Sequence, residues 1–405
     1  MSSTAATDLS HARTPPGGGL LLRLLAANWT IGTLTIQLPD GAVHVLEGRE
    51  PGPRGVLRIK DFRFARRVLA SGDIGFAEGY IAEEWDTPNL AALLEALVRN
   101  HENIRRLFEG NAAMKAINWL SHRLNRNSRA GARRNIHAHY DLGNAFYAAW
   151  LDPTMTYSSA RFDKPTDTLK AAQRRKYQTL ARAMDLKAGH TVLEIGCGWG
   201  GFAEYAAREI GAHVTGVTLS KEQHDYAVER LAKAGLSNRA VIKLVDYRDV
   251  VGQFDRVASI EMFEAVGQEY WPAYFGKIRE VLKPGGRAGL QIITIDDRYF
   301  ASYAKRTDFI QKYIFPGGVL PSKGALRPVI DAAGLAWAGV ERFGLDYAET
   351  LKRWDARFQA AWGRIDRLPG FDERFRRLWR FYLAYCEAGF STGRIDVMQL
   401  ALELK

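Results

Sequence analysis

Cysteine is scarce in this sequence, which holds only Cys197 and Cys386 among 405 residues. Two distant cysteines exclude a disulfide framework and a zinc site built from several thiolates, so we expect no metal and a reducing cytoplasm. Long apolar runs are also missing: LLLRLLAA, at 20–27, contains Arg23 and is too short to span a bilayer. Residues 1–18 are polar or small, so we interpret them as a disordered lead-in and not as a secretory signal.

Acidic residues are too few to balance the basic ones, since 45 against 56 gives a net charge of +11. Such an excess favours an anionic partner, either a phospholipid surface or a nucleic acid. Residues 121–135 contain no acid but hold Arg123, Arg126, Arg129, Arg133 and Arg134. A second basic segment, 372–385, interleaves arginines with aromatic residues at helical spacing, as a helix at a membrane interface does. Packing of those aromatics in a protein core is an equal alternative.

The chain is long enough for two domains. Residues 19–120 mix short strand patterns with helical ones and predict a small α+β domain, and 121–135 are interpreted as a basic linker. From 136 to 405, apolar strand patterns alternate with helical patterns; the strands are TVLEIGC, AHVTGVTL, AVIKLVD, FDRVASIE and RAGLQIITI. This alternation predicts a parallel, doubly wound α/β sheet, in which ligands bind at the carboxyl ends of the strands.

The first of these strand patterns ends in a glycine-rich loop that fits two ligands. Gly196, Gly198 and Gly201 match the dinucleotide pattern G-x-G-x-x-G. Glu194 with Gly196, Gly198 and Gly200 also matches E-x-G-x-G-x-G, a loop that binds S-adenosylmethionine.

Residues at the ends of the next two strand patterns decide between a dinucleotide and S-adenosylmethionine. A nicotinamide site needs an acid after the second strand, to bind the ribose, but residues 218–220 are Thr-Leu-Ser. Glu194 can accept a hydrogen bond near the amino-acid end of S-adenosylmethionine, and Asp246 is placed to meet its adenine amino group. Glu194, the glycine loop, residues 218–220 and Asp246, taken in this order, therefore favour a methyltransferase over a dinucleotide-binding enzyme.

Common signatures of nucleic-acid methyltransferases are missing, because there is no Pro-Cys dipeptide and no Pro-Pro-Tyr-like tetrad. Other motifs occur in one order from about 139 to 351: HYDLGNAFYAAWLDPTMTYSSARF, VLEIGCGWGGFAEYAA, GVTLSKEQ, DYRD, MFEAVG, KYIFPGG and GLDYAETL. In these motifs the chain resembles the cyclopropane-fatty-acyl-phospholipid synthase family, relatives of the mycolic acid cyclopropane synthases. Its first domain is similar to that of bacterial phospholipid-modifying members. The resemblance implies a class I methyltransferase (Rossmann-like) domain with acyl-chain-binding insertions.

The resemblance also implies roles for residues around the cofactor. Thr218, Leu219 and Gln223 would contact it together with Gly196 and Gly198. Tyr157 and Ser158 would cover its methionine end, and Tyr247 would lie near the adenine.

The catalytic residues carry over only in part. Family members are thought to use a bound bicarbonate as the base, held by a glutamate, a tyrosine, a histidine and a cysteine. Glu264 and Tyr347 match the first two, but Ser159 stands at the cysteine position and Gln291 at the histidine position. Serine and glutamine still donate hydrogen bonds, so an anion can be held, but the titratable histidine is gone.

The leading hypothesis is a methyltransferase that moves a methyl group from S-adenosylmethionine to the double bond of unsaturated phospholipid acyl chains. The product would be a cyclopropane or a methyl- or methylene-branched chain. We expect a cytoplasmic protein bound peripherally to the inner face of an anionic membrane, with no nucleic-acid partner; a homodimer stays a hypothesis. The alternatives are a small-molecule amine methyltransferase and a non-catalytic paralogue that binds S-adenosylmethionine or membrane.

Overall fold

The computed structural model describes residues 18–108 and 142–405, which fall into two compact units. The first comprises Met1–Ile117 with Arg377–Phe381, and the second comprises Asn118–Arg376 with Tyr382–Lys405. The predicted basic linker, 121–135, lies outside the described residues. The sequence prediction assigned 377–381 to the second domain, whereas these residues group with the first unit.

The first unit contains a four-stranded sheet in the order β2-β1-β3-β4. Its strands are β1 (Ile31–Gln37), β2 (Val43–Glu47), β3 (Glu50–Ile59) and β4 (Trp85–Asp86). Its helices are α1 (Gly18–Asn28), α2 (Arg63–Ser71), α3 (Asp73–Ile81), α4 (Leu90–Arg99) and α5 (His101–Phe108). Every second residue of β1 is buried, which gives the sheet one apolar face, and α4 packs against β1 and β3.

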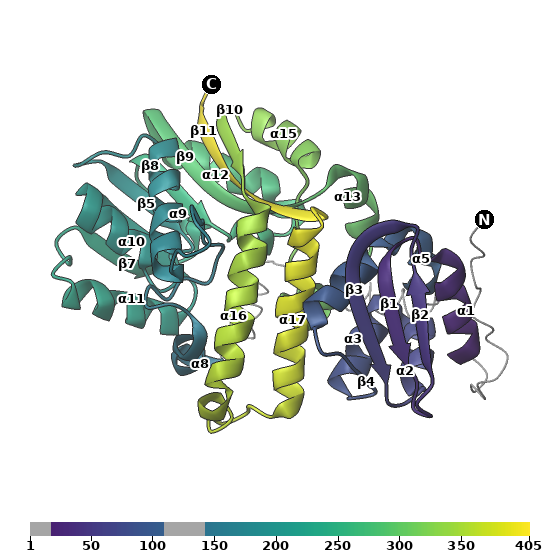
Figure 1. Cartoon of the computed structure of the whole chain (residues 1–405). Coiled ribbons are helices and arrows are strands. Elements are labelled where there is room, and N and C mark those ends of the chain that lie inside the picture. Colours follow the sequence, from purple (N-terminus) through teal and green to yellow (C-terminus); the bar gives the residue numbers. More distant parts are fainter. Residues whose placement is uncertain (1–17, 109–141) are drawn as a thin grey trace. The chain divides into compact units, whose positions relative to one another are not determined.

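The second unit is built on a seven-stranded sheet in the order β10-β11-β9-β8-β5-β6-β7 (Figure 1). The predicted strand patterns form its five parallel strands: β5 (Thr191–Ile195), β6 (His213–Thr218), β7 (Ala240–Leu244), β8 (Phe254–Ile260) and β9 (Leu282–Ile295). The doubly wound prediction is therefore confirmed. Two further strands, β10 (Leu335–Arg342) and β11 (Ile395–Leu404), extend the sheet beyond β9 in antiparallel fashion.

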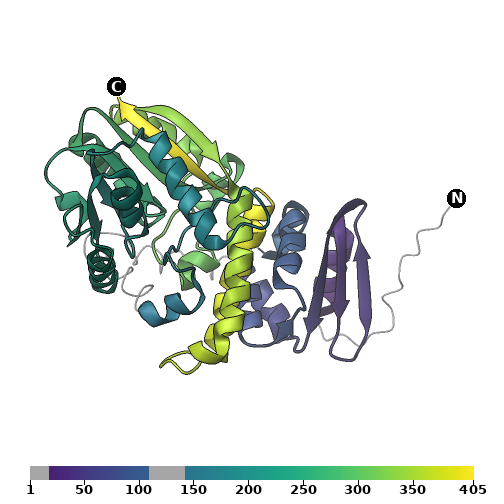
Figure 2. The ribbon, with the colours of Figure 1, turned by 60° about the vertical axis from the view of Figure 1, so that its left-hand side comes forward.

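Helices cover both faces of this sheet. The first face carries α9 (Leu169–Ala183), α10 (Gly201–Tyr205) and α11 (Lys221–Lys233), and the second carries α12 (Trp271–Val281) and α15 (Lys323–Ala332). Side chains alternate along β5, so Val192 joins the core beneath α9 and Leu193 the core beneath α12. Figures 1 and 2 both show α9 lying across its face of the sheet.

The remaining helices of the second unit precede or follow the parallel strands. They are α8 (Gly143–Trp150), α13 (Asp297–Tyr303), α14 (Phe309–Tyr313), α16 (Gly344–Ile365) and α17 (Glu373–Ser391), of which 377–381 group with the first unit. Between the parallel strands lie a short π-helix, η1 (Ala206–Ile210), and three 3-10 helices, η2 (Tyr247–Asp249), η3 (Phe263–Ala265) and η4 (Gln268–Tyr270). Because β6 and β8 lie on opposite sides of β5, the chain reverses direction across the sheet there. Such a switch point is where ligands bind in doubly wound folds.

The structure bears on two expectations about membranes: that no segment spans a bilayer and that 372–385 resembles a helix at a membrane interface. No helix within residues 18–108 and 142–405 combines the length and apolarity that a membrane span requires. The basic segment 372–385 forms part of α17, but Trp379 and Phe381 are each only 2% exposed. These two aromatic side chains therefore pack inside the protein, as the core-packing alternative predicts.

Candidate active site

The loop between β5 and α10 leaves open space beside one glycine. Gly196, Gly198 and Gly200 have φ angles of +78°, +51° and +79°, which favour glycine. An added Cβ would lie 2.6 Å from Met262 at Gly196 and 3.1 Å from Ala227 at Gly200, but would meet no atom within 4 Å at Gly198. Gly198 is thus the position where the backbone can approach a ligand, as the S-adenosylmethionine motif requires.

Glu194 lies beside this loop near the end of β5. Its side chain is buried, and its Oε2 atom has no hydrogen-bond partner among the described residues. Burial raises the pKa of Glu194 to about 8. An orphaned carboxyl oxygen suits a ligand that brings a donor, such as the ammonium group of S-adenosylmethionine, so the residues present fit this cofactor.

The ends of the next two strands hold the other predicted cofactor residues. Thr218 and Gln223 are buried and joined by a 2.9 Å hydrogen bond from Thr218 Oγ1 to Gln223 Oε1, with the partly buried Leu219 between them in sequence. Asp246 is buried after β7 and is paired with Arg248 at 2.5 Å. Its predicted bond to adenine stays a prediction.

Tyr247, beside Asp246, packs edge-on against Tyr274 at 5.4 Å between ring centroids. Burial raises the pKa of Tyr247 to about 12. It is therefore a neutral, partly buried aromatic in η2, three residues after β7, and its place near the adenine stays a prediction.

The segment before α9 places Tyr157 and Ser158. The Tyr157 hydroxyl lies 2.7 Å from that of Tyr382. Ser158 is buried and held by α9, because Lys176 Nζ donates to its Oγ at 2.6 Å and Gln173 Nε2 donates to its carbonyl oxygen at 2.9 Å.

Three of the four predicted catalytic residues gather around a carboxylate that the sequence analysis did not select, that of Glu261. The backbone N–H of Ser159 donates to Glu261 Oε1 at 2.8 Å, and Gln291 Nε2 donates to the same oxygen at 2.7 Å. The Tyr347 hydroxyl donates to Oε2 at 2.6 Å. Ser159 takes part through its backbone alone, since its hydroxyl donates to the carbonyl oxygen of Ala160.

Glu261 adopts a backbone conformation that a side chain rarely takes, with φ of +49° directly after β8. A non-glycine residue in this region costs about 1–3 kcal/mol and is typical of functional sites. Burial raises the pKa of Glu261, whereas the hydrogen bond from Tyr347, the charge of Lys176 and the bonds from Ser159 and Gln291 lower it. Burial is the largest of these effects, so the pKa of Glu261 is raised overall, while the hydrogen bonds and the charge of Lys176 act in favour of the ionised carboxylate.

Glu264, the fourth predicted catalytic residue, forms no hydrogen bond with Glu261, Ser159, Gln291 or Tyr347. One of its carboxyl oxygens accepts from the backbone N–H of Ile293, and the other is buried without a partner among the described residues. Burial, together with the charge of Glu261, raises the pKa of Glu264 to about 8. It is thus mostly a neutral acid at pH 7, and its catalytic role stays a prediction.

The expected bicarbonate has no free place in this cluster. Its predicted donors from Ser159, Gln291 and Tyr347 already bind Glu261. The residues present therefore do not fit an additional anion there, and we derive no step through bicarbonate.

A sequence signal for Glu261 did exist. It ends the strand pattern FDRVASIE, and an acid at the carboxyl end of a parallel strand lies at the ligand-binding edge of the sheet.

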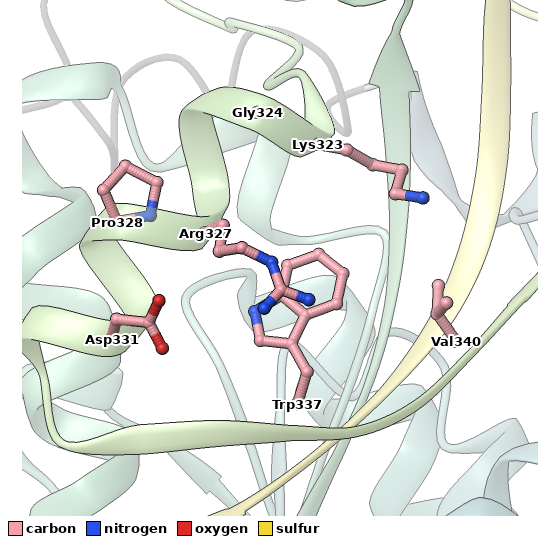
Figure 3. Close-up of a pocket in the computed structure, with 7 residues that line it drawn as sticks. All are labelled: Lys323, Gly324, Arg327, Pro328, Asp331, Trp337 and Val340. Atoms are coloured by element: carbon pink, nitrogen blue, oxygen red, sulfur yellow. The ribbon is translucent and has the colours of Figure 1, made fainter.

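A groove of about 560 Å³ lies elsewhere in the second unit, between α15 and β10. Its lining residues, drawn in Figure 3, are Lys323, Gly324, Arg327, Pro328, Asp331, Trp337 and Val340. The Arg327 guanidinium lies over the indole of Trp337, 4.8 Å from the ring centroid. None of the predicted site residues lines this groove, so it is separate from the Glu261 cluster.

Comparisons with known proteins agree with this geometry. A sequence model of the mycolic acid cyclopropane synthetase family matches residues 127–400. The chain is 42% identical to the tuberculostearic acid methyltransferase UfaA1 of Mycobacterium tuberculosis, over 84% of this chain and 80% of that protein. It is 36% identical to the cyclopropane-fatty-acyl-phospholipid synthase of Escherichia coli K12, over 85% of this chain and 86% of that protein.

A solved structure matches about two thirds of the chain. The crystal structure of mycolic acid cyclopropane synthase CmaA1 with SAH and CTAB superposes with a TM-score of 0.62 at 32% identity, covering 67% of this chain and 97% of that one. The fold is that of a class I methyltransferase. The chain therefore belongs to the mycolic acid cyclopropane synthetase family and is an S-adenosylmethionine-dependent methyltransferase acting on lipid acyl chains.

Proposed function

We propose that this enzyme methylates the double bond of an unsaturated phospholipid acyl chain and that Glu261 accepts the released proton, giving a methylene-branched chain. The observation that carries the proposal is the Glu261 carboxylate, held by donors from Ser159, Gln291 and Tyr347. A carboxylate fixed in this way is a base that belongs to the protein itself.

The reaction balances without a further reactant. S-adenosylmethionine, when bound, supplies an electrophilic methyl group on its sulfonium sulfur. Transfer breaks the sulfur–methyl bond, forms a carbon–carbon bond with one alkene carbon and leaves a cation on the other. A hydride shift moves the cation to the methyl-bearing carbon, and loss of a methyl proton to Glu261 gives a C=CH2 double bond, the methylene branch.

The surroundings of Glu261 suit a cationic acyl chain. The Tyr347 ring stacks on Phe390 at 4.3 Å and stands edge-on to Trp354 at 6.2 Å. Aromatic faces attract a cation and exclude water that would otherwise trap it. Holding the alkene in line with the methyl group removes much of the entropic part of the barrier.

The names of two relatives and the residues around Glu261 support the proposed product and substrate. The relative at 42% identity is named a methyltransferase and not a cyclopropane synthase, and the groups around Glu261 differ from the ligand set implied by the family resemblance at Ser159 and Gln291. The relative named as a phospholipid synthase matches 85% of this chain, which favours a phospholipid substrate.

The test is methyl transfer from labelled S-adenosylmethionine to dioleoyl-phosphatidylglycerol vesicles in carbonate-free buffer. The two products have the same mass, but NMR of the released fatty acids distinguishes the C=CH2 protons of a methylene branch from the ring protons of a cyclopropane. We expect methylene signals and no stimulation by added bicarbonate. A purely cyclopropane product that depends on bicarbonate would contradict the proposal, as would turnover of small amines but not of vesicles.

The matched pair Glu261→Gln and Glu264→Gln identifies the base. Loss of a general base typically costs about 10²–10⁴-fold in rate, so we expect that loss at Glu261. Glu264→Gln replaces a largely neutral acid by a neutral amide, so its loss should be much smaller at pH 7. Both variants should still bind S-adenosylmethionine by calorimetry. Equal activity of Glu261→Gln and the unmodified enzyme would exclude Glu261 as the base.

A further inference from the structure

Lys176, on helix α9, is a buried lysine that the proposed chemistry does not use. Its side chain is 0% exposed, and it forms no ion pair with any carboxylate of residues 18–108 or 142–405. Its Nζ atom donates to Ser158 Oγ and lies 4.6 Å from the centroid of the Tyr177 ring. An ammonium group buried without a direct counter-ion is costly, so its presence calls for a function.

Two short chains of contacts connect Lys176 to Glu261. Its Nζ holds the residue immediately before Ser159, whose N–H donates to Glu261 at 2.8 Å. Its carbonyl oxygen accepts from Gln399 Nε2 at 3.0 Å, and the same Nε2 donates to Gln291 Oε1 at 3.1 Å. Gln291 in turn donates to Glu261 at 2.7 Å.

The positive charge of Lys176 and the negative charge of Glu261 affect each other's pKa. Burial lowers the pKa of Lys176 to about 7, and the charge of Glu261 is the largest effect that opposes this lowering. In the reverse direction, the charge of Lys176 lowers the pKa of Glu261 against the effect of burial. The other titratable groups around the two side chains are Asp152, Glu194, Tyr177, Glu264 and Tyr347.

We propose that Lys176 is a positioning residue for Glu261: its ammonium charge holds that carboxylate in the ionised form that accepts a proton. This inference rests on the proposed function, because it takes Glu261 as the base. Lys176 acts through Glu261 and the serine segment, since its own contacts are with protein groups.

The test compares Lys176→Met with Gln173→Met. Gln173 lies one turn earlier on α9, is also 0% exposed and donates to the carbonyl oxygen of Ser158 at 2.9 Å. Both variants remove a buried hydrogen bond to Ser158, but only Lys176→Met removes a charge. Replacing a buried, unpaired ion by an apolar chain is tolerated by folded proteins, and melting temperatures check this.

The first measurement is the dependence of kcat on pH. Glu261 works only when ionised, so activity is lost as the pH falls through its pKa. Loss of a nearby positive charge makes ionisation harder, and the acidic limb of Lys176→Met should move to higher pH by about one unit or more. The limb of Gln173→Met should stay in place. An unmoved limb in Lys176→Met, or an equal shift in both variants, would overturn the inference.

The second measurement needs no turnover. Infrared difference spectra record the carbonyl band of protonated Glu261, which the Glu261→Gln variant identifies by its disappearance. In Lys176→Met this band should persist to higher pH than in the unmodified protein, and an unchanged titration would again overturn the inference. If the unmodified protein methylates no lipid but the band responds as expected, the proposed function fails while the electrostatic link stands.

Discussion

The open space beside Gly198 gives a direct test of the cofactor site at the scale of a single residue. Gly198→Val fills that space and forces a branched side chain to adopt a φ of +51°, so S-adenosylmethionine binding measured by calorimetry should be lost. Gly189→Val is the control, because Gly189 also has a positive φ, +79°, and open space around its Cβ, but lies before β5. Normal binding by a folded Gly198→Val variant would exclude this loop as the site.

Glu194 predicts release of a proton on cofactor binding. With a pKa of about 8, its carboxyl group is mostly neutral at pH 7 in the free protein. A positively charged ligand group beside it lowers that pKa, so binding should release up to about one proton near pH 7. Calorimetry in buffers of different ionisation enthalpy measures this number. Glu194→Gln should release correspondingly fewer protons, and an unchanged release would mean that Glu194 does not face the ligand.

Among single residues, the sequence was informative where a backbone motif determines the place. Glycines that need positive φ, and residues directly after parallel strands, can be located from their order alone. Glu261 could not be selected in this way, because its importance comes from Ser159, Gln291 and Tyr347 converging on it from distant parts of the chain. Lys176 could not be selected either, because a lysine in a helical pattern is normally exposed and its burial is not visible in the sequence.

At the scale of elements, the five parallel strands were predicted and the two antiparallel strands were not. The parallel strands have short apolar runs flanked by glycine or helical patterns. The sequence of β11, IDVMQLALEL, lacks a strict alternation of apolar and polar residues and suits a helix equally well. Its strand form depends on pairing with β9 and β10, which are distant in sequence.

This dependence predicts a large effect of one substitution in β11. Leu400 is 0% exposed, pairs with Leu290 of β9 and belongs to the core beneath α12. Leu400→Ala should lower the free energy of unfolding by about 2–5 kcal/mol, measured by urea denaturation. The control is Glu403→Ala on the same strand, which removes only an exposed 3.3 Å ion pair with Arg287 and should cost about 1 kcal/mol or less. Similar losses in both variants would mean that β11 contributes little to the core.

At the scale of the whole molecule, the net charge of +11 predicts binding to anionic membranes. Changing Arg123, Arg126, Arg129, Arg133 and Arg134 to glutamine should weaken binding to anionic vesicles and flatten its salt dependence, with about 1 kcal/mol lost for each charge near the surface. Sedimentation with vesicles measures both quantities.

Two comparisons make that experiment specific. Changing the exposed Lys170, Arg182 and Lys243 of the second unit to glutamine should have a smaller effect per charge. Cofactor affinity should stay unchanged in both variants. Equal binding of the unmodified protein to neutral and anionic vesicles would contradict an electrostatic attachment.

The place of β11 between β9 and β10 also affects how the chain is made. β9 ends at Ile295 and β11 begins at Ile395, so the ribosome adds about a hundred residues after β9 before its partner exists. At roughly 5–20 residues per second, β9 waits on the order of 5–20 s with an unpaired edge. Exposed edges of this kind attract other chains. The nascent enzyme should therefore depend on chaperones during this interval, and rapid overproduction should favour aggregation of incomplete chains over a finished sheet.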